Sequence, residues 1–404
     1  MLDTDPGGFA TWLGTDDTSV LRTSSAKEGT TQLYVIDNYK SAHRVLAGTV
    51  NGPVGSVRTA AVKGAINLVF ASRSYPNGTI YNAKKDIAPH SSGRVFNSLF
   101  VKHWDQVVSD KKLSLFSLRM SQNNGAFRIS EPRNLLPAGS GLESPIPPFG
   151  GLGHFDLAPD GSKVVFVAKT PFLNPANNTQ TLVYQVPFDG SREPEAINGP
   201  DGRDALGKML PQGASTGPKF APDGKSVAYL QMYENGYESD ANKVFVRTSD
   251  SKIYPIAGDW DFSPASLIWT LNGQGVIVAA EHRGRVKLFQ IILRNSKVST
   301  LWQRSSVVGQ GFYALPKGKI LITASSLVSS AQTFLLDPIR STVKVLTAKP
   351  EAQRELSSSQ VEEFHFSGAD DVPVHGFIIK PSNLRESDRS KYKLAFFIHG
   401  GPQG

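Results

Sequence analysis

The chain has 404 residues, of which 39% are hydrophobic and 19% charged, a balance that supports a folded core and excludes global disorder. The net charge is +8, but the basic residues are scattered and do not form the stripe that nucleic-acid binding uses. Cysteine is absent, which excludes disulfides, zinc–thiolate sites and a cysteine nucleophile. We therefore expect no nucleic-acid partner.

No stretch approaches the roughly 18 apolar residues of a membrane-spanning helix. Residues 1–14 lack both the basic and the apolar region of a signal peptide. Neither a zincin motif nor a phosphate-binding or dinucleotide fingerprint occurs. The sequence thus predicts no membrane segment, no metal and no cofactor.

Short strands joined by tight turns are predicted from the N-terminus onward. Residues 10–17 lead to the alternating stretch 32–37, and residues 58–70 carry Lys63-Gly64 at a turn. A long insertion is predicted from about Ser72 to Gly150. An insertion of this size on one repeat is typical of a place where a repeat protein meets another partner or domain.

Two clear copies of a repeat follow, in residues 154–168 and 217–230. Each copy reads as a short strand, a Pro-Asp-Gly turn and a strand of alternating apolar residues. The Asp-Gly pair suits a tight turn because glycine takes the positive φ that the turn needs. A third strand is predicted after each copy, in residues 182–186 and 243–247.

Weaker copies of the repeat lie in residues 267–280 and 312–324. Six units of four strands are typical of a β-propeller. A β-sandwich with fortuitous Asp-Gly turns is the alternative. The predicted fold is mainly β, with a propeller over residues 1–356.

The pattern changes after the last repeat. Residues 361–366 and 374–381 predict a hairpin, and residues 392–398 are a nearly continuous apolar run. Such a run is typical of a strand buried on both faces of an α/β sheet. We predict that residues 357–404 begin a second domain.

The chain ends in His399-Gly400-Gly401-Pro402. Together with the Pro-Asp-Gly repeats and the stretches 102–105 and 236–240, this motif resembles the prolyl oligopeptidase family of serine peptidases, most closely its fungal dipeptidyl-peptidase V branch, which is related to the acylaminoacyl peptidases. The resemblance implies a seven-bladed propeller before an α/β-hydrolase domain, with about six blades readable here.

The resemblance also implies a secreted enzyme that releases N-terminal dipeptides from peptides. It places the Ser-Asp-His triad beyond this chain, so we expect no catalytic residue here and a hydrolase domain in cis. By this interpretation the chain is a fragment, truncated at both ends.

Ser215 lies in Gly213-Ala214-Ser215-Thr216-Gly217, which matches the G-x-S-x-G nucleophile elbow. A nucleophile elbow needs a helix directly behind the serine, whereas Pro218 and a predicted strand follow here. In α/β-hydrolases the His-Gly-Gly loop also precedes the nucleophile in the chain, whereas Ser215 comes before His399. We therefore interpret Ser215 as a serine in a loop between repeats.

The His-Gly-Gly motif is predicted to form an oxyanion loop, with the Gly401 N–H as donor, Gly400 permitting the turn and His399 holding the loop. The alternative is a simple turn at the end of a strand. Glu238 and Asp240, followed by Asp105, are predicted to bind the free α-amine of a substrate. For these acidic residues the alternative is a solvated loop.

Two N-glycosylation acceptors, Asn77 and Asn177, lie in polar, turn-rich stretches. Two hypotheses of function remain open from the sequence. The chain is part of a serine dipeptidyl-peptidase, or it is a propeller that binds peptides or proteins and catalyses nothing.

Overall fold

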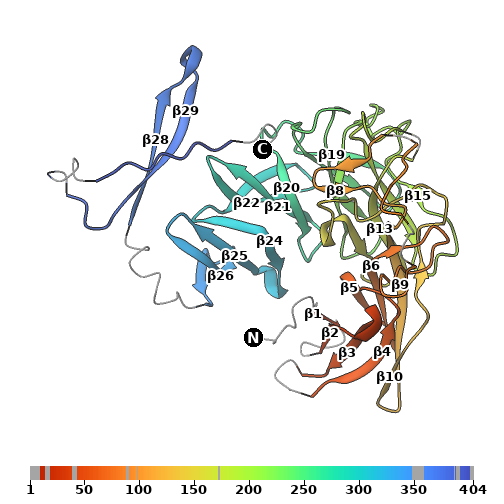
Figure 1. Cartoon of the computed structure of the whole chain (residues 1–404). Helices are drawn as coiled ribbons and strands as arrows, with labels where there is room; N and C mark the ends of the chain where they lie inside the picture. The colour runs from red at the N-terminus through yellow and green to blue at the C-terminus, as the bar shows by residue number, and fades with distance from the viewer. Residues whose placement is uncertain are drawn as a thin grey trace. The chain divides into compact units, whose positions relative to one another are not determined.

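The computed structural model describes most of the chain as antiparallel sheets joined by loops (Figure 1). Two compact units are found, Met1–Pro255 and Ile256–Gly404. The described residues are 10–13, 19–38, 43–87, 91–97, 99–171, 173–347, 359–385, 387 and 392–400.

Four sheets of four or five strands make up most of the described part of the first unit, and each runs in chain order from strand to neighbouring strand. The first sheet consists of β1 (Ala10–Trp12), β2 (Val20–Ser25), β3 (Thr31–Ile36) and β4 (Val45–Val50). The second consists of β5 (Gly55–Val62), β6 (Ala65–Ser74), β9 (Lys112–Asn123) and β10 (Ala126–Ile129), with β11 (Arg133–Asn134) paired to β9. The third consists of β12 (Phe155–Leu157), β13 (Lys163–Lys169), β14 (Thr181–Pro187) and β15 (Glu195–Ala196). The fourth consists of β16 (Ser215–Phe220), β17 (Val227–Gln231), β18 (Lys243–Arg247) and β19 (Ile253–Ile256).

The second unit has two four-stranded sheets of the same kind and a hairpin. One sheet is β20 (Pro264–Trp269), β21 (Gly275–His282), β22 (Arg285–Ile292) and β23 (Lys297–Trp302), and the other is β24 (Ser306–Ala314), β25 (Ile320–Ser326), β26 (Ser329–Asp337) and β27 (Thr342–Val345). The hairpin is β28 (Gln360–Ser367) and β29 (Pro373–Lys380). The described helices are single 3-10 turns, namely η1 (Lys27–Gly29), η2 (Leu152–His154), η3 (Pro316–Gly318) and η5 (Ala369–Asp371), and none could span a membrane.

The Pro-Asp-Gly turns are built alike in successive sheets. The N–H of Gly161 donates to the carbonyl of Ala158 at 2.8 Å, and the N–H of Gly224 donates to Ala221 at 2.9 Å. The two glycines have φ of +69° and +67°, which a residue with a Cβ adopts only with strain. The turn residues therefore fix where the first strand of each sheet ends and the second begins.

The hydrophobic cores of the first unit lie between consecutive sheets. One core joins side chains of the first and second sheets, a second joins the second and third, and a third joins the third and fourth. The middle strands are consequently covered on both faces, and nearly every residue of β6 is buried. Sheets packed face to face in chain order are the arrangement of propeller blades.

An aromatic pair recurs at the same place in three sheets. Phe70 faces Phe116, Phe166 faces Tyr184 and Tyr229 faces Phe245 across the second and third strands. The ring centroids are 5.7, 5.5 and 5.7 Å apart and the rings are stacked. Cross-strand aromatic pairs add about 0.5–1.5 kcal/mol each beyond the burial of their surface.

The predicted insertion from Ser72 to Gly150 is wrong in its boundaries. Residues 112–134 form strands of the second sheet, and β9 pairs with β6 over ten residues from Ala65↔Ser121 to Ser74↔Lys112. The buried stretch of β9 includes Ser114 and Ser117, which interrupt the apolar pattern that a buried strand normally shows. The inserted segment is therefore residues 75–111, and it carries the small hairpin of β7 (Lys102–His103) and β8 (Gln106–Val107).

The hairpin predicted around residues 368–371 is present as β28 and β29. The prediction of a strand in residues 392–398 is wrong, and residues 392–400 form no strand in the structure. Phe396, Phe397 and Ile398 are 70–90% exposed, and an apolar run becomes a buried strand only where a neighbouring strand supplies its hydrogen bonds.

Candidate functional site

A pocket of about 280 Å³ lies within the first unit. Its walls come from the inserted segment 75–111, from residues 141–148 and from the loop that connects β13 to β14. The inserted segment and the β13–β14 loop both join the second strand of a sheet to the third, so they lie at corresponding edges of their sheets. Loops at one edge of a rigid set of sheets are a common place for a binding site.

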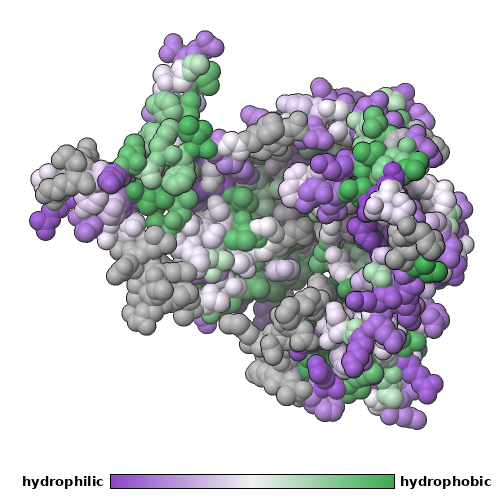
Figure 2. Space-filling model, viewed as in Figure 1, coloured by the Kyte–Doolittle hydropathy of each residue, from purple (hydrophilic) through white to green (hydrophobic). Residues whose placement is uncertain are grey.

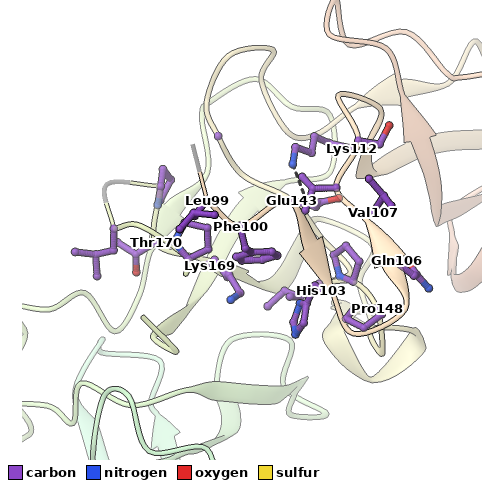
Figure 3. Close-up of a pocket in the computed structure, with 18 of the residues that line it drawn as sticks. Leu99, Phe100, His103, Gln106, Val107, Lys112, Glu143, Pro148, Lys169 and Thr170 are labelled. Carbon is purple, nitrogen blue, oxygen red and sulfur yellow. Dashed lines mark ion pairs between the residues drawn. The ribbon is translucent and has the colours of Figure 1, made fainter. Parts of the chain in front are cut away.

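The centre of the pocket is an aromatic ring between two basic side chains. Phe100 lies between Lys169 and His103 (Figure 3), with the Lys169 ammonium 5.4 Å from its ring centroid and the His103 ring 5.2 Å away, edge to face. Leu99, Pro148 and Pro171 contribute further apolar wall. An ammonium over a ring face gains a modest cation–π attraction.

A second pair of charges lies at another side of the pocket. The Lys112 ammonium is 3.5 Å from a carboxylate oxygen of Glu143, drawn as a dashed line in Figure 3. The other carboxylate oxygen of Glu143 accepts a hydrogen bond from the N–H of Leu113 at 2.9 Å. Both oxygens of Glu143 are therefore engaged by the protein itself.

Lys169 was not singled out in the sequence, and it ends the buried strand β13. Burial lowers the pKa of its ammonium, and the negative charge of Glu238 acts in the opposite direction. Glu238 itself is exposed, in the loop that connects β17 to β18. A lysine at the end of an otherwise apolar strand is the signal that could have identified it.

The loop that carries Glu238 is tied to the pocket loop. The side-chain oxygen of Asn235 accepts a hydrogen bond from the N–H of Thr179 at 3.0 Å, and the N–H of Gly236 donates to the Thr179 hydroxyl at 2.8 Å. The charge of Glu238 therefore acts on Lys169 at the pocket.

Asp240 lies in the same loop between β17 and β18, where it contacts backbone. Its carboxylate accepts hydrogen bonds from the N–H groups of Tyr233, Glu234 and Ala241, all between 2.7 and 2.8 Å. Those contacts close the loop, so the carboxylate is occupied by backbone. Asp105 is exposed in the turn of the β7–β8 hairpin, and it is not among the residues that line the pocket.

Ser215 is buried at the start of β16, with 2% of its surface exposed, and thus does not lie in a loop. Its hydroxyl accepts a hydrogen bond from the amide of Asn198 at 2.9 Å, and its N–H donates to the hydroxyl of Thr181 at 2.7 Å. A strand follows Ser215, as predicted. The serine is engaged in connecting two sheets, and no solvent-facing hydroxyl is presented there.

A buried charge cluster lies on the first strands of three sheets. A guanidinium nitrogen of Arg58 on β5 is 3.5 Å from the carboxylate of Asp156 on β12, which also accepts the N–H of Phe220 at 3.0 Å. Burial lowers the pKa of Lys219 on β16 to about 8, although the negative charge of Asp156 acts to raise it. Burial and the positive charge of Lys219 lower the pKa of the neighbouring His154.

Of the predicted oxyanion loop, His399 and Gly400 are exposed, and Gly401 lies outside the described residues. Among the described residues, and apart from the chain neighbours of Gly400, no atom lies within 4 Å of where a Cβ on Gly400 would stand. Both predicted glycosylation acceptors are exposed. The Asn77 side chain accepts hydrogen bonds from the N–H and hydroxyl of Thr79, and Asn177 lies in the β13–β14 loop.

Curated relatives of this sequence are dipeptidyl-peptidases. The chain is 36% identical over 405 residues to dipeptidyl-peptidase 5 of Aspergillus fumigatus, which covers 97% of this chain and 55% of that protein. It is also 36% identical over 410 residues to dipeptidyl-peptidase 5 of Trichophyton schoenleinii, with 98% and 55% covered. The chain thus spans about half the length of these relatives. No family model matches the sequence.

Several solved structures with the same fold are peptidases. The Pyrococcus horikoshii acylaminoacyl peptidase aligns with a TM-score of 0.59 at 14% identity, over 92% of this chain and 50% of that one. A prolyl endopeptidase aligns with a TM-score of 0.54 at 11% identity, over 95% and 48%. These likenesses confirm the mainly β, propeller fold class. The 36% identity to the curated relatives confirms the predicted resemblance to the prolyl oligopeptidase family in its dipeptidyl-peptidase branch, and the chain is a homologue of the dipeptidyl-peptidases 5.

Proposed function

We propose that this chain is the substrate-binding propeller part of a serine dipeptidyl-peptidase, which releases N-terminal dipeptides from peptides. The observation that carries this proposal is the similarity to dipeptidyl-peptidases 5 over 97% of the chain. The buried position of Ser215 agrees with a catalytic triad that lies beyond this sequence. The pocket between the inserted segment and the β13–β14 loop supports a role in binding peptides.

Within this proposal, Glu238 binds the free α-amine of the substrate. A dipeptidyl-peptidase must recognise an unblocked amine, and a carboxylate at a fixed distance from the nucleophile does so by a charge-assisted hydrogen bond. Glu238 is exposed and its charge reaches Lys169 at the pocket. Asp240 holds the loop in shape through its three backbone hydrogen bonds, and Asp105 remains a further candidate for the amine.

The His-Gly-Gly segment is proposed to supply an oxyanion donor, the N–H of Gly401. Glycines let the backbone approach a substrate closely because they have no Cβ. Loss of one such donor typically costs about 3 kcal/mol of transition-state stabilisation. His399 holds the turn in this proposal and is not a general base.

The test of the amine site uses the native protein that carries this sequence, with the Glu238→Gln variant and chromogenic dipeptide substrates. We expect the variant to raise KM by about tenfold for free-amine substrates, with little change for N-acetylated ones, because only the former carry the positive charge that Glu238 attracts. Equal effects on both substrates would contradict the assignment of Glu238.

The alternative is a propeller that binds peptides and catalyses nothing. It predicts that the native protein releases no dipeptide and is not labelled by a serine-directed organophosphate. Organophosphate-sensitive release of dipeptides supports the peptidase. Labelling at Ser215 would contradict the interpretation of that serine as structural.

A further inference from the structure

The pocket around Phe100 has more positive charge than the protein itself neutralises. Its charged wall consists of Arg73, Lys112 and Lys169 against one carboxylate, that of Glu143. Lys112 is paired with Glu143 at 3.5 Å, and Arg73 donates to the backbone carbonyl of Lys111 at 2.9 Å. Among the described residues that line the pocket, none forms an ion pair with Lys169, and the exposed Glu238 acts on it only through its charge, so Lys169 is available to a ligand.

Lys169 has the surroundings of an anion-binding group. The side chain is half-buried, and in the described part of the chain its ammonium makes no hydrogen bond or ion pair and contacts the ring face of Phe100. Removal of water strengthens the attraction between an ammonium and an anion because the effective dielectric constant falls. An anionic ligand group at this position would therefore gain more than it would at an exposed lysine.

The remaining wall indicates which anion fits. The ammonium lies over the ring of Phe100, and Leu99, Leu173, Pro148 and Pro171 add apolar surface to the same pocket. A phosphate group needs several converging donors, whereas a single ammonium beside apolar walls suits a carboxylate that is attached to an apolar body. The cavity of about 280 Å³ is slightly below the common range of about 300–1,000 Å³ for small-molecule sites, so it suits one or two residues of a peptide.

We propose that this pocket binds a carboxylate group of a short peptide, with Lys169 as its ion-pair partner and Phe100 and the prolines as apolar walls. The carboxylate comes from the C-terminus of the peptide or from an acidic side chain. The proposal rests on the proposed function only in taking a peptide as the ligand. It adds a site for the acidic end of the peptide to the proposed site for the amine at Glu238.

The experiment measures binding by isothermal titration calorimetry with the full 404-residue chain at constant ionic strength. The probes are acetyl-Ala-Pro with a free carboxylate, acetyl-Ala-Pro-amide, acetyl-Glu-Pro-amide and inorganic phosphate. We expect acetyl-Ala-Pro to bind at least tenfold more tightly than its amide. Binding of acetyl-Glu-Pro-amide as tight as that of acetyl-Ala-Pro would identify an acidic side chain as an equivalent source.

Three variants test the role of Lys169 in binding the carboxylate. Lys169→Met should weaken binding of the acid peptide about tenfold, and Lys169→Arg, which keeps the charge, should restore it to within about threefold of the native chain. Lys163→Met is the matched control, because Lys163 lies at the other end of the same strand β13, and it should bind as the native chain does. A thermal melt of each variant shows whether it is folded.

The proposal is overturned if acid and amide bind equally, if phosphate binds more tightly than the acid peptide, or if the folded native chain binds no probe at millimolar concentration. It is also overturned if Lys169→Met and Lys163→Met behave alike. The peptidase proposal fails by a different result, the absence of dipeptide release. If the native protein that carries this sequence releases no dipeptide while the 404-residue chain binds acid peptides through Lys169, this inference is retained and the peptidase proposal is lost.

Discussion

Lys219 in the buried charge cluster is predicted to destabilise the fold at neutral pH. Its ammonium nitrogen is buried, and burial lowers its pKa from 10.5 to about 8 in spite of the nearby carboxylate of Asp156. A tenfold change in proton affinity equals about 1.4 kcal/mol, so the charged form costs about 3 kcal/mol in the folded state. Replacement by methionine keeps an unbranched side chain and removes this cost.

We expect Lys219→Met to raise the free energy of unfolding by about 1–3 kcal/mol at pH 7, because the variant removes the cost of the buried charge while Arg58 still pairs with Asp156. The stability advantage of the variant should decrease as the pH rises. Below pH 8 the lysine is charged in both states and the full cost is present. Between pH 8 and 10.5 the unfolded chain binds more protons than the folded one, so the native chain gains stability and the advantage of the variant shrinks.

Urea denaturation of the native chain, Lys219→Met and Lys225→Met at pH 7, 8, 9 and 10 measures this effect. Lys225 is an exposed lysine at the turn between β16 and β17, and its replacement should change stability by less than about 0.5 kcal/mol. The reasoning is refuted if Lys219→Met is less stable than the native chain at pH 7. It is refuted as well if the difference between them does not shrink as the pH rises to 10.

Two further predictions concern single hydrogen-bonded groups. Ser215→Ala should lower the free energy of unfolding by about 1–2 kcal/mol in urea, because the amide of Asn198 loses the closer of its two buried acceptors, and an unchanged stability would contradict this. Glu363→Gln should speed backbone amide exchange in β28 and β29 at pH 7, since Glu363 pairs with Arg285 on β22 and with His375 at 3.2 Å. Arg285 foremost, and then His375, hold the pKa of Glu363 below its usual range, so the native hairpin should exchange like the variant only when the pH falls below that lowered pKa. Equal exchange of native chain and variant at pH 7 would exclude a role of this pair in holding the hairpin.

The hairpin also presents an apolar surface. Figure 2 shows green, hydrophobic residues along β28 and β29, and Phe364, Phe366 and Ile379 are 40–49% exposed. Phe377 is different, because its ring lies beneath the guanidinium of Arg285 at 5.0 Å. The pattern of alternating residues in the sequence predicted the hairpin but did not reveal which side of it is covered.

Much of the fold follows from local sequence. Turns at Gly161 and Gly224 need positive φ, and alternating apolar residues around them predict the strands that the structure contains. These features are readable because turn geometry and strand alternation depend on neighbouring residues in the chain. The family resemblance carried by the repeats and the His-Gly-Gly motif was likewise present in the sequence.

The tertiary structure alone decided which polar residues are available for binding. Asp240 and Glu238 lie two positions apart in one acidic loop. The carboxylate of Asp240 is occupied by three backbone N–H groups, whereas Glu238 remains exposed and its charge acts on Lys169. Lys169 and Phe100 are 69 positions apart in the chain and meet at one pocket. Contacts of this kind depend on how separate sheets pack, and no local pattern encodes them, because the hydrogen bonds and charges of a side chain are set by residues that arrive from elsewhere in the sequence.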